Sequence, residues 1–290
     1  KTMKKIVAFL LIFEMISVLA AQNSLQFSGY FEHQFAPQKQ QGHWIYQDHN
    51  KLRLNLDAAI DEQVSLFGNY IIRLQHGERS FSLCDYVPVH LIEQYISIWG
   101  ISQDSLRSLY AFDFEDEYFL ENAYISLYGK NLSLRIGKQQ LPWGTGYAWN
   151  PTELFHSKNR LEPTYDKEGV NAIKLETPFI RGGIFTAVWA PNEDWERSIR
   201  ALKMQTYCNG IEFSFSAAEK PVSWTTNQNQ WRRMLGFDFS SALFGLGVWG
   251  EASYNVMSKS KDFGLYLAGV DYTFINGLYV QAEYFYDERG

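Results

Sequence analysis

The feature that most limits how this chain can fold is a period-two alternation of apolar and polar residues. It is clearest near the end, where Leu278, Val280, Ala282, Tyr284 and Tyr286 alternate with Tyr279, Gln281, Glu283, Phe285 and Asp287. Because successive side chains of a β-strand point to opposite faces, this order predicts a strand with one oily and one mostly polar face. Residues 51–58 and 248–256 alternate in the same way.

Thirteen segments carry a pattern of this kind. They lie at residues 24–35, 44–60, 63–76, 118–128, 131–139, 169–177, 182–190, 199–207, 210–218, 231–240, 245–257, 263–274 and 278–287. The fourth and sixth segments alternate least cleanly. All are expected to be strands.

The connections between these segments alternate in length, which a soluble β-sandwich would not require. Short ones fall at Asp61-Glu62, Gly129-Lys130, 178–181, Cys208-Asn209, 241–244 and Asn276-Gly277, and longer ones at 36–43, 77–117, 140–168, 191–198, 219–230 and 258–262. Outer-membrane barrels have short periplasmic turns and longer external loops, and Tyr and Phe near their strand ends form aromatic girdles. The sequence therefore predicts an all-β fold, a transmembrane antiparallel up-and-down β-barrel of the outer membrane with a periplasmic N-terminus.

The first residues have the order of a secretory signal. Met3-Lys4-Lys5 precede an apolar run from Ile6 to Leu19 and the small residues Ala20 and Ala21. An anchoring helix is the alternative, but the run is shorter than the roughly 20 residues that span a bilayer, and Glu14 interrupts it. We expect residues 1–20 to be a signal peptide and residues 21–290 to form the barrel.

Composition fits a barrel better than a soluble protein. Aromatic residues make up 17% of the chain, yet the mean hydropathy is -0.27. Strands with one face toward lipid and one toward water average to such a value. The formal net charge of -6 argues against a nucleic-acid partner.

Thirteen is an odd number, whereas single-chain bacterial barrels have even strand numbers. The last segment also stops at Asp287-Glu288-Arg289-Gly290, which is typical of the opening of a loop. We therefore expect the C-terminal strand or strands of the barrel to be missing from this sequence, and about 14–18 strands in the whole protein.

The most distinctive stretch runs from Leu134 to Phe155. It contains Arg135-Ile136-Gly137-Lys138-Gln139 followed by Trp143-Gly144. This order of arginine, glycine, a basic residue, glutamine and then tryptophan-glycine at a strand end resembles porin-like families, such as the alginate-export and related uncharacterised outer-membrane barrels. The resemblance covers about twenty residues. It implies a porin-like barrel and no particular substrate.

The loop within this stretch cannot continue as a strand, because prolines at 142 and 151 and glycines around Thr145 break it. Its aromatic residues Trp143, Tyr147 and Trp149 are too large and apolar to stand free in water. Asn150-Pro151 also has the order of a helix cap and first turn. We expect these three side chains and Asn150 to belong to a constriction loop folded into the lumen; the alternative is an external lid that packs on other loops.

The polar faces of the strands carry charges of both signs. The candidate pore-lining residues are Lys51, Arg53, Asp57, Arg73, Arg135, Lys138, Lys174, Glu212, Asp238, Glu251, Asp271 and Glu283. Apart from Asp57, the basic residues precede the acidic ones in sequence, which would create a transverse field that orients polar solutes. Alternatively, the charges pair locally and fill space.

Residues 77–117 contain an apolar pattern near helical spacing, followed by Asp113, Glu115, Asp116 and Glu117. A short helix over the mouth or an extra hairpin would fit the first part. The acidic run is expected to be a solvated loop rather than a metal site, because it has no regular ligand spacing. The two cysteines, Cys84 and Cys208, are expected to be unpaired.

Catalytic motifs are absent: the chain has no Gly-x-Ser-x-Gly, His-Glu-x-x-His or phosphate-binding glycine loop. His43, Asp48 and His49 leave an outer-membrane hydrolase as a minor alternative. We expect a non-enzymatic, porin-like channel without cofactor or metal, for passive passage of small hydrophilic solutes. Its partners would be outer-membrane lipid and lipopolysaccharide, small polar solutes, and further copies of the chain in a homo-oligomer. The runner-up is a barrel that binds polysaccharide or assembles envelope components at the surface.

Overall fold

The structure is a computed structural model that describes residues 25–40, 43–156, 168–179, 182–222 and 230–290. The expected signal peptide, residues 1–20, lies outside this part. The chain divides into two compact units. One contains residues 57–67 and 121–290, and the other contains residues 26–56 and 68–120.

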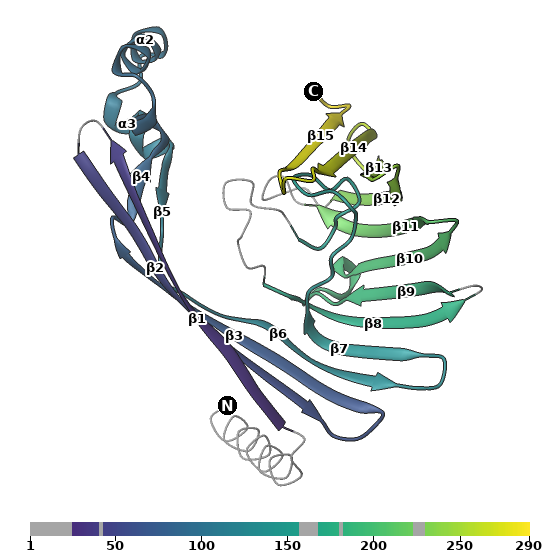
Figure 1. Cartoon of the computed structure of the whole chain (residues 1–290). Helices are drawn as coiled ribbons and strands as arrows, with labels where there is room; N and C mark the ends of the chain where they lie inside the picture. The colour runs from purple at the N-terminus through teal and green to yellow at the C-terminus, as the bar shows by residue number, and fades with distance from the viewer. Residues whose placement is uncertain (1–24, 41–42, 157–167, 180–181, 223–229) are drawn as a thin grey trace. The chain divides into compact units, whose positions relative to one another are not determined.

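Thirteen strands form the main sheet and follow one another in sequence order (Figure 1). They are β1 (Leu25–Gln40), β2 (His43–Ala59), β3 (Val64–Gly77), β6 (Glu117–Tyr128), β7 (Ser133–Gln139), β8 (Val170–Phe179), β9 (Gly183–Ala190), β10 (Ile199–Cys208), β11 (Ile211–Val222), β12 (Gln230–Leu243), β13 (Leu246–Met257), β14 (Phe263–Thr273) and β15 (Tyr279–Asp287). Each of the thirteen predicted segments corresponds to one of these strands, so the antiparallel up-and-down fold is confirmed. The order ends at β1 and β15.

Tight turns join the strands on one side of the sheet. Asn209 and Gly210 link β10 to β11 with positive φ angles of 51° and 83°. Two consecutive positive φ values define the primed turn that matches the twist of a hairpin, and Asn-Gly is its preferred sequence. Phe244 and Gly245 form the same kind of turn between β12 and β13, with φ angles of 55° and 82°.

One predicted connection is wrong in length. Residues 36–43 were expected to form a long link, but β1 extends to Gln40 and β2 begins at His43. Residues 36–40 contain a proline and three consecutive polar residues, so they lack the alternation of apolar and polar residues that marks a strand. The connections at 78–116, 140–169, 191–198 and 223–229 are longer than the turns on the other side of the sheet, whereas the β13–β14 connection at 258–262 has the same five-residue length as the β14–β15 turn at 274–278.

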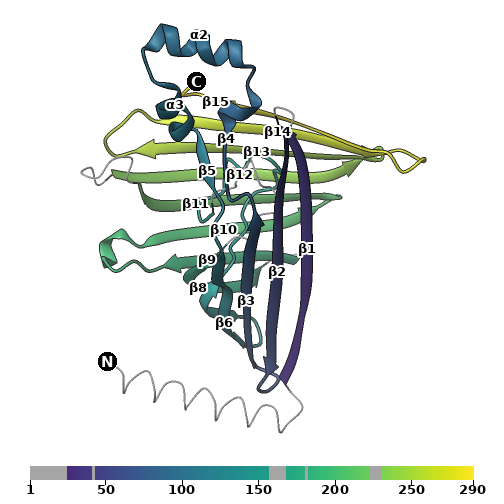
Figure 2. The ribbon, with the colours of Figure 1, turned by 90° about the vertical axis from the view of Figure 1, so that its left-hand side faces the viewer.

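Residues 78–116 contain both helices and a pair of short strands, and the position of the helices over the channel mouth stays a prediction. The short strands β4 (Ser80–Ser82) and β5 (Ala111–Asp113) pair, and between them lie the 3₁₀ helix η1 (Leu83–Tyr86) and the helices α2 (Val89–Trp99) and α3 (Gln103–Leu109) (Figure 2). Cys84, Ile92 and Leu106 form a small buried core among them. The Ser102 hydroxyl caps α3 by accepting a hydrogen bond from the Ser105 N–H at 3.2 Å.

Among the described residues, no helix is both long and apolar enough to span a bilayer. Both cysteines are free thiols, Cys84 buried and Cys208 exposed. The prediction of unpaired cysteines is therefore confirmed.

The two faces of β7 to β15 differ as the alternation predicted. On β13, Tyr254 and Val256 are exposed, whereas Glu251, Ser253 and Asn255 are buried. The exposed face carries large apolar side chains such as Leu235, Phe215 and Tyr284. Residues 140–156, in the connection between β7 and β8, cover part of this polar face.

Candidate functional site

The pairing register shows which candidate residues share a face. In antiparallel strands, directly opposed residues lie on the same face, and residues two apart on one strand do too. Following the register from β7 to β15 places seven of the predicted pore-lining residues together: Arg135, Lys174, Glu212, Asp238, Glu251, Asp271 and Glu283. We call this face of β7–β15 the inner face, and the opposite one the oily face.

The described part of the β7–β8 connection, residues 140–156, packs on the inner face and is called the inner loop. Glu251 is its main attachment point. The carboxylate accepts hydrogen bonds from the backbone N–H groups of Thr145 and Gly146, each at 2.5 Å, and from the N–H and hydroxyl of Thr152 at 3.2 and 3.0 Å. Gly144 has a φ of +86°, and a Cβ there would lie 2.7 Å from both carboxylate oxygens. The loop approaches Glu251 so closely because a glycine stands at this position.

Glu283 on β15 holds the next part of the loop. Its Oε1 accepts hydrogen bonds from the Tyr147 N–H at 2.6 Å and from the Trp249 indole at 2.9 Å, and its Oε2 accepts one from the Ala148 N–H at 2.8 Å. Two carboxylates therefore bind four consecutive backbone N–H groups, from 145 to 148. A carboxylate that accepts several N–H bonds is a strong anchor, because charge-assisted hydrogen bonds are about twice as strong as neutral ones.

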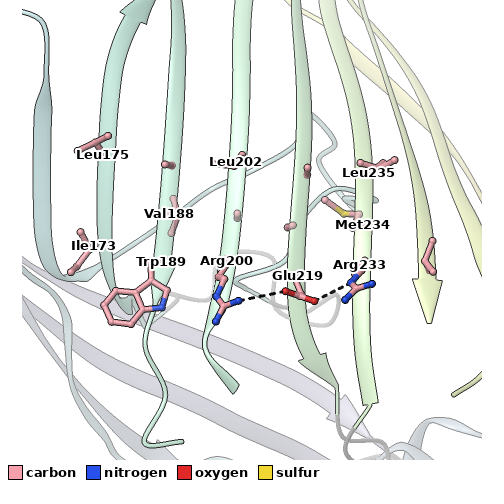
Figure 3. Close-up of a pocket in the computed structure, with 15 residues that line it drawn as sticks. Ile173, Leu175, Val188, Trp189, Arg200, Leu202, Glu219, Arg233, Met234 and Leu235 are labelled. Atoms are coloured by element: carbon pink, nitrogen blue, oxygen red, sulfur yellow. Dashed lines mark hydrogen bonds and ion pairs between the residues drawn. The ribbon is translucent and has the colours of Figure 1, made fainter. Parts of the chain in front are cut away.

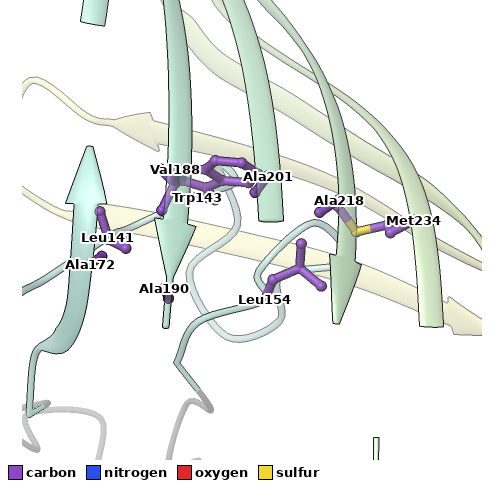
Figure 4. Packing of buried hydrophobic residues seen from close by; sticks show 9 residues of the cluster. All are labelled: Leu141, Trp143, Leu154, Ala172, Val188, Ala190, Ala201, Ala218 and Met234. Carbon is purple, nitrogen blue, oxygen red and sulfur yellow. The ribbon is translucent and has the colours of Figure 1, made fainter. Parts of the chain in front are cut away.

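Apolar packing fixes the two ends of the loop. Leu141, Trp143 and Leu154 are buried against small and aliphatic side chains of β8 to β12: Ala172, Val188, Ala190, Ala201, Ala218 and Met234 (Figure 4). These sheet residues lie on the inner face by the same register. Small side chains at this patch give the loop room to lie close to the backbone of the sheet.

The other two aromatic residues rest on aromatic partners from the sheet. Trp149 stacks on Phe285 with ring centroids 5.6 Å apart and an interplanar angle of 3°. Tyr147 contacts the Trp249 ring edge-on at 5.2 Å and remains 59% exposed. Tyr147 is thus the most exposed of the three aromatic residues.

The helix expected at Asn150-Pro151 does not form. A single turn occurs instead, closed by a hydrogen bond from the Glu153 N–H to the Asn150 carbonyl at 3.2 Å. The Asn150 side chain does not cap this turn; its amide donates to the Trp143 carbonyl at 3.1 Å. The Glu153 carboxylate accepts hydrogen bonds from the backbone N–H groups of Trp143, Phe155 and His156. These backbone groups therefore have partners without a helix.

The basic candidates on β7 and β8 lie side by side. Arg135 and Lys174 are direct register partners. The Arg135 guanidinium lies 4.2 Å from the centre of the Tyr124 ring, and Lys174 pairs with Glu176 at 2.9 Å. Lys138 has the opposite parity to Arg135 on the same strand, so the register assigns it to the other face, where it pairs with Glu168. The register therefore disagrees with the prediction that Lys138 shares the polar face with Arg135, because residues three apart on a strand lie on opposite faces.

The remaining acidic candidates make fewer contacts with the loop. Asp238 is buried beside Glu251, its register partner. Glu212 accepts a hydrogen bond from the Gln205 amide at 2.6 Å, and Asp271 accepts one from the Tyr279 hydroxyl at 3.2 Å. Local pairing therefore accounts for part of the charge on the inner face.

The candidates on β2 and β3 have their own partners. Lys51 is buried with its Nζ 5.4 Å from the centre of the Tyr30 ring. Arg53 donates to the Asn55 amide oxygen at 3.1 Å, and Arg73 pairs with Glu117 at 3.1 Å. Asp57 is exposed.

Asp48 and His49, which were considered for a hydrolase site, do not point to a common site. Asp48 and His49 are adjacent on β2, so their side chains leave opposite faces of the strand. The side chain of His43 lies outside the described part. In the acidic run, Asp116 pairs with Arg79 at 3.4 Å, and the described residues include no group of three or more His, Cys, Asp or Glu placed to hold a metal ion.

The residues that sequence reasoning missed are those that use their backbone. Thr145, Gly146 and Thr152 bind Glu251 through N–H groups, which every residue type except proline carries. The only available signal was the pair of glycines on either side of Thr145.

Comparison with known proteins places this geometry in a structural class. No family model and no curated protein matches the chain. The solved structures that are similar to this chain include OmpF of Salmonella typhi, with 10% identity, a TM-score of 0.51 and coverage of 91% of this chain and 78% of that one. They also include an anion-selective porin from Comamonas acidovorans, with 11% identity, a TM-score of 0.52 and coverage of 92% of this chain and 80% of that one.

The chain therefore has the fold of an outer-membrane porin-like β-barrel. The porin-like resemblance predicted from residues 134–155 is confirmed at the level of the fold. The narrower likeness to alginate-export families stays a prediction.

Proposed function

We propose that this chain forms a passive, non-enzymatic channel for small hydrophilic solutes and that the inner loop narrows the aqueous path. The observation that carries the proposal is the attachment of the loop to Glu251 and Glu283, on the polar face of the sheet. The polar face of a wide barrel lines its water-filled lumen, and a loop bound there reduces the open cross-section.

The loop is held at several independent points, as a constriction requires. Two carboxylates bind its centre, and Trp143 is only 5% exposed in the apolar cluster that fixes one end. A lid resting on neighbouring loops would gain nothing from buried carboxylates on the strands. The similar solved structures include a protein named as an anion-selective porin, which also supports a channel.

The distribution of charge on the inner face favours polar over apolar solutes. Arg135 and Lys174 lie on β7 and β8, whereas Glu212, Asp238 and Asp271 lie on β11, β12 and β14. This separation would orient polar solutes across the path and disfavour apolar ones. Because Glu251 and Glu283 are engaged by the loop, the field would depend on the remaining charges.

Conductance of the purified full-length protein in planar lipid bilayers tests the proposal. The parent should conduct, and Tyr147→Ala should raise conductance without added noise, because Tyr147 is exposed and its loss leaves the anchors intact. Trp143→Ala should instead give noisy openings, because truncating a buried aromatic costs roughly 3–5 kcal/mol and releases the loop.

Trp195→Ala is the matched control, because Trp195 is 66% exposed on a different connection, between β9 and β10. It should leave conductance unchanged. If the Trp143, Tyr147 and Trp149 triple alanine variant conducts and discriminates sugars by size like the parent, the inner loop is not the constriction. A sealed parent that binds polysaccharide would favour the surface-binding alternative.

The remaining expectations are part of the same proposal. The apolar exposed face suits outer-membrane lipid, and copies of the chain would associate through part of that face as a homo-oligomer. The N-terminus would lie in the periplasm.

A further inference from the structure

The oily face of β8 to β12 is not smooth. A row of directly opposed residues crosses it in the order Leu175, Ala187, Leu202, Ala217 and Leu235. Each alanine lies between two leucines, so the row has two depressions separated by the Leu202 side chain. Together they form an open groove of about 950 Å³ with almost entirely apolar walls (Figure 3).

A charged row lies two residues farther along the same strands and borders this groove. Glu219 on β11 pairs with Arg233 at 3.0 Å and with Arg200 at 3.9 Å, as Figure 3 shows. The side chains of Arg200 and Arg233 are 58% and 73% exposed, and that of Glu219 is 27% exposed. Two cations on one anion leave an excess positive charge, and the carboxylate between them holds both guanidinium groups beside the groove.

The position of this row matches the boundary between hydrocarbon and headgroups. Trp189 is the register partner of Arg200 and lines the same groove. Tryptophan is enriched at membrane interfaces, whereas an exposed arginine on a lipid-facing surface is costly in hydrocarbon and tolerable at the interface. An apolar groove that ends in two arginines therefore has the two parts of a lipid site, one for acyl chains and one for a headgroup.

We propose that this groove binds a phospholipid with an anionic headgroup, with acyl chains in the depressions at Ala187 and Ala217 and the phosphate at Arg200 and Arg233. Guanidinium groups bind phosphate through paired, charge-assisted hydrogen bonds, which gives the site its preference for an anionic headgroup. Free phosphate would use only the arginines and gain nothing from the groove. The site is on the face opposite the inner loop, so it does not depend on the proposed channel.

The test uses the folded full chain in a neutral detergent and counts bound lipids by native mass spectrometry. The probes are dioleoyl phosphatidic acid, dioleoyl phosphatidylcholine and inorganic phosphate at equal concentration. The parent should retain phosphatidic acid roughly tenfold better than phosphatidylcholine, as one or two charged hydrogen bonds would give. Inorganic phosphate should not displace the lipid.

Variants separate the two parts of the site. Arg200→Gln with Arg233→Gln should abolish the preference for phosphatidic acid and leave phosphatidylcholine retention unchanged, and the double Lys variant should retain an intermediate preference. Ala217→Leu should lower retention of both lipids by filling a depression. Lys259→Gln with Lys261→Gln is the control, because it removes two exposed charges from the β13–β14 connection and should change nothing.

An unchanged preference in the Gln variant would overturn the proposal, and so would displacement of the lipid by inorganic phosphate. If the Gln and Leu variants instead change the number of chains in the complex while lipid retention stays constant, the groove is an interface between copies. A change of migration on gels after heating identifies variants that fold as barrels. If the double Gln variant does not fold, the lipid preference of the double Lys variant tests the proposal instead.

Discussion

Glu251, a residue of β13, binds the backbone of the inner loop at three positions. Its carboxylate accepts hydrogen bonds from three backbone N–H groups and two hydroxyls of residues 145–152, and Glu251 is only 3% exposed. A buried N–H left without a partner costs more than an ordinary hydrogen bond contributes. The conformation of the inner loop therefore depends on this one residue of β13.

Glu251→Ala should open the loop. We expect amide hydrogen exchange at residues 145–152 to become at least about tenfold faster, since one hydrogen bond to a charged group is worth roughly 1.5–3 kcal/mol. Asp238→Ala is the control, because Asp238 is an equally buried neighbour without a hydrogen bond to the described part of the loop. Equal exchange in the parent and the Glu251 variant would show that the apolar anchors suffice.

Gly146 is a second single-residue test. A Cβ at this position would lie 2.0 Å from the Trp149 carbonyl oxygen, which is backbone and cannot move aside cheaply. Gly146→Ala should therefore distort the loop at a cost of about 1–3 kcal/mol and release the backbone around Tyr147, so that chymotrypsin can cleave after this residue. Gly129→Ala, where the nearest atom would be 3.3 Å away, should leave cleavage unchanged. Resistance of the Gly146 variant to the protease would contradict the packing described for the loop.

At the scale of single elements, the hairpin turns explain how the strands keep their register. Asn209-Gly210 combines the favoured residues of a primed turn with the positive φ angles that it needs. The turn at Phe244-Gly245 has the same geometry with an unfavourable first residue, because Phe244 has a φ of 55° and is fully exposed. A bulky residue in the left-handed region costs roughly 1–2 kcal/mol.

Phe244→Asn should therefore stabilise the β12–β13 hairpin by about 1 kcal/mol. Urea unfolding of the protein in lipid vesicles would measure the change in the free energy of unfolding. Ile275→Asn removes an equally exposed apolar side chain from the β14–β15 turn, where the backbone φ is not positive, and should give no such gain. A gain of the same size in both variants would point to removal of exposed apolar surface rather than relief of strain.

At the scale of the whole molecule, the unequal connections on the two sides of the sheet predict sidedness. The native Cys208 is exposed beside a two-residue turn, and Lys259 lies on the opposite side, between β13 and β14. We expect an impermeant maleimide to leave Cys208 unlabelled on intact cells and to label it after permeabilisation. Lys259→Cys in a Cys208→Ser background should be labelled on intact cells. The reverse labelling pattern would place the N-terminus outside.

The sequence by itself determined the strands, their order and the face on which each side chain lies. All three follow from local rules: alternation marks a strand, short turns pair consecutive strands, and the pleat assigns residues to faces. The faces of Glu251 and Glu283 could therefore be predicted from residues 248–256 and 278–287 alone. The face predicted for Lys138 was wrong, because this residue is three positions from Arg135 and therefore on the opposite side of β7. The end of β1 was missed because residues 36–40 do not alternate between apolar and polar residues.

Only the tertiary structure decided what covers the polar face. The link between the inner loop and Glu251 joins residues about one hundred positions apart, and its donors are backbone N–H groups that leave no mark in the sequence. The turn at Asn150 also depends on tertiary contacts. Its sequence is typical of a helix start, but the carboxylates of Glu153 and Glu251 accept hydrogen bonds from its backbone N–H groups, and no helix forms. The charged row beside the oily groove likewise appears only when β10, β11 and β12 are aligned, since register between strands, and not order within one, brings Arg200, Glu219 and Arg233 together.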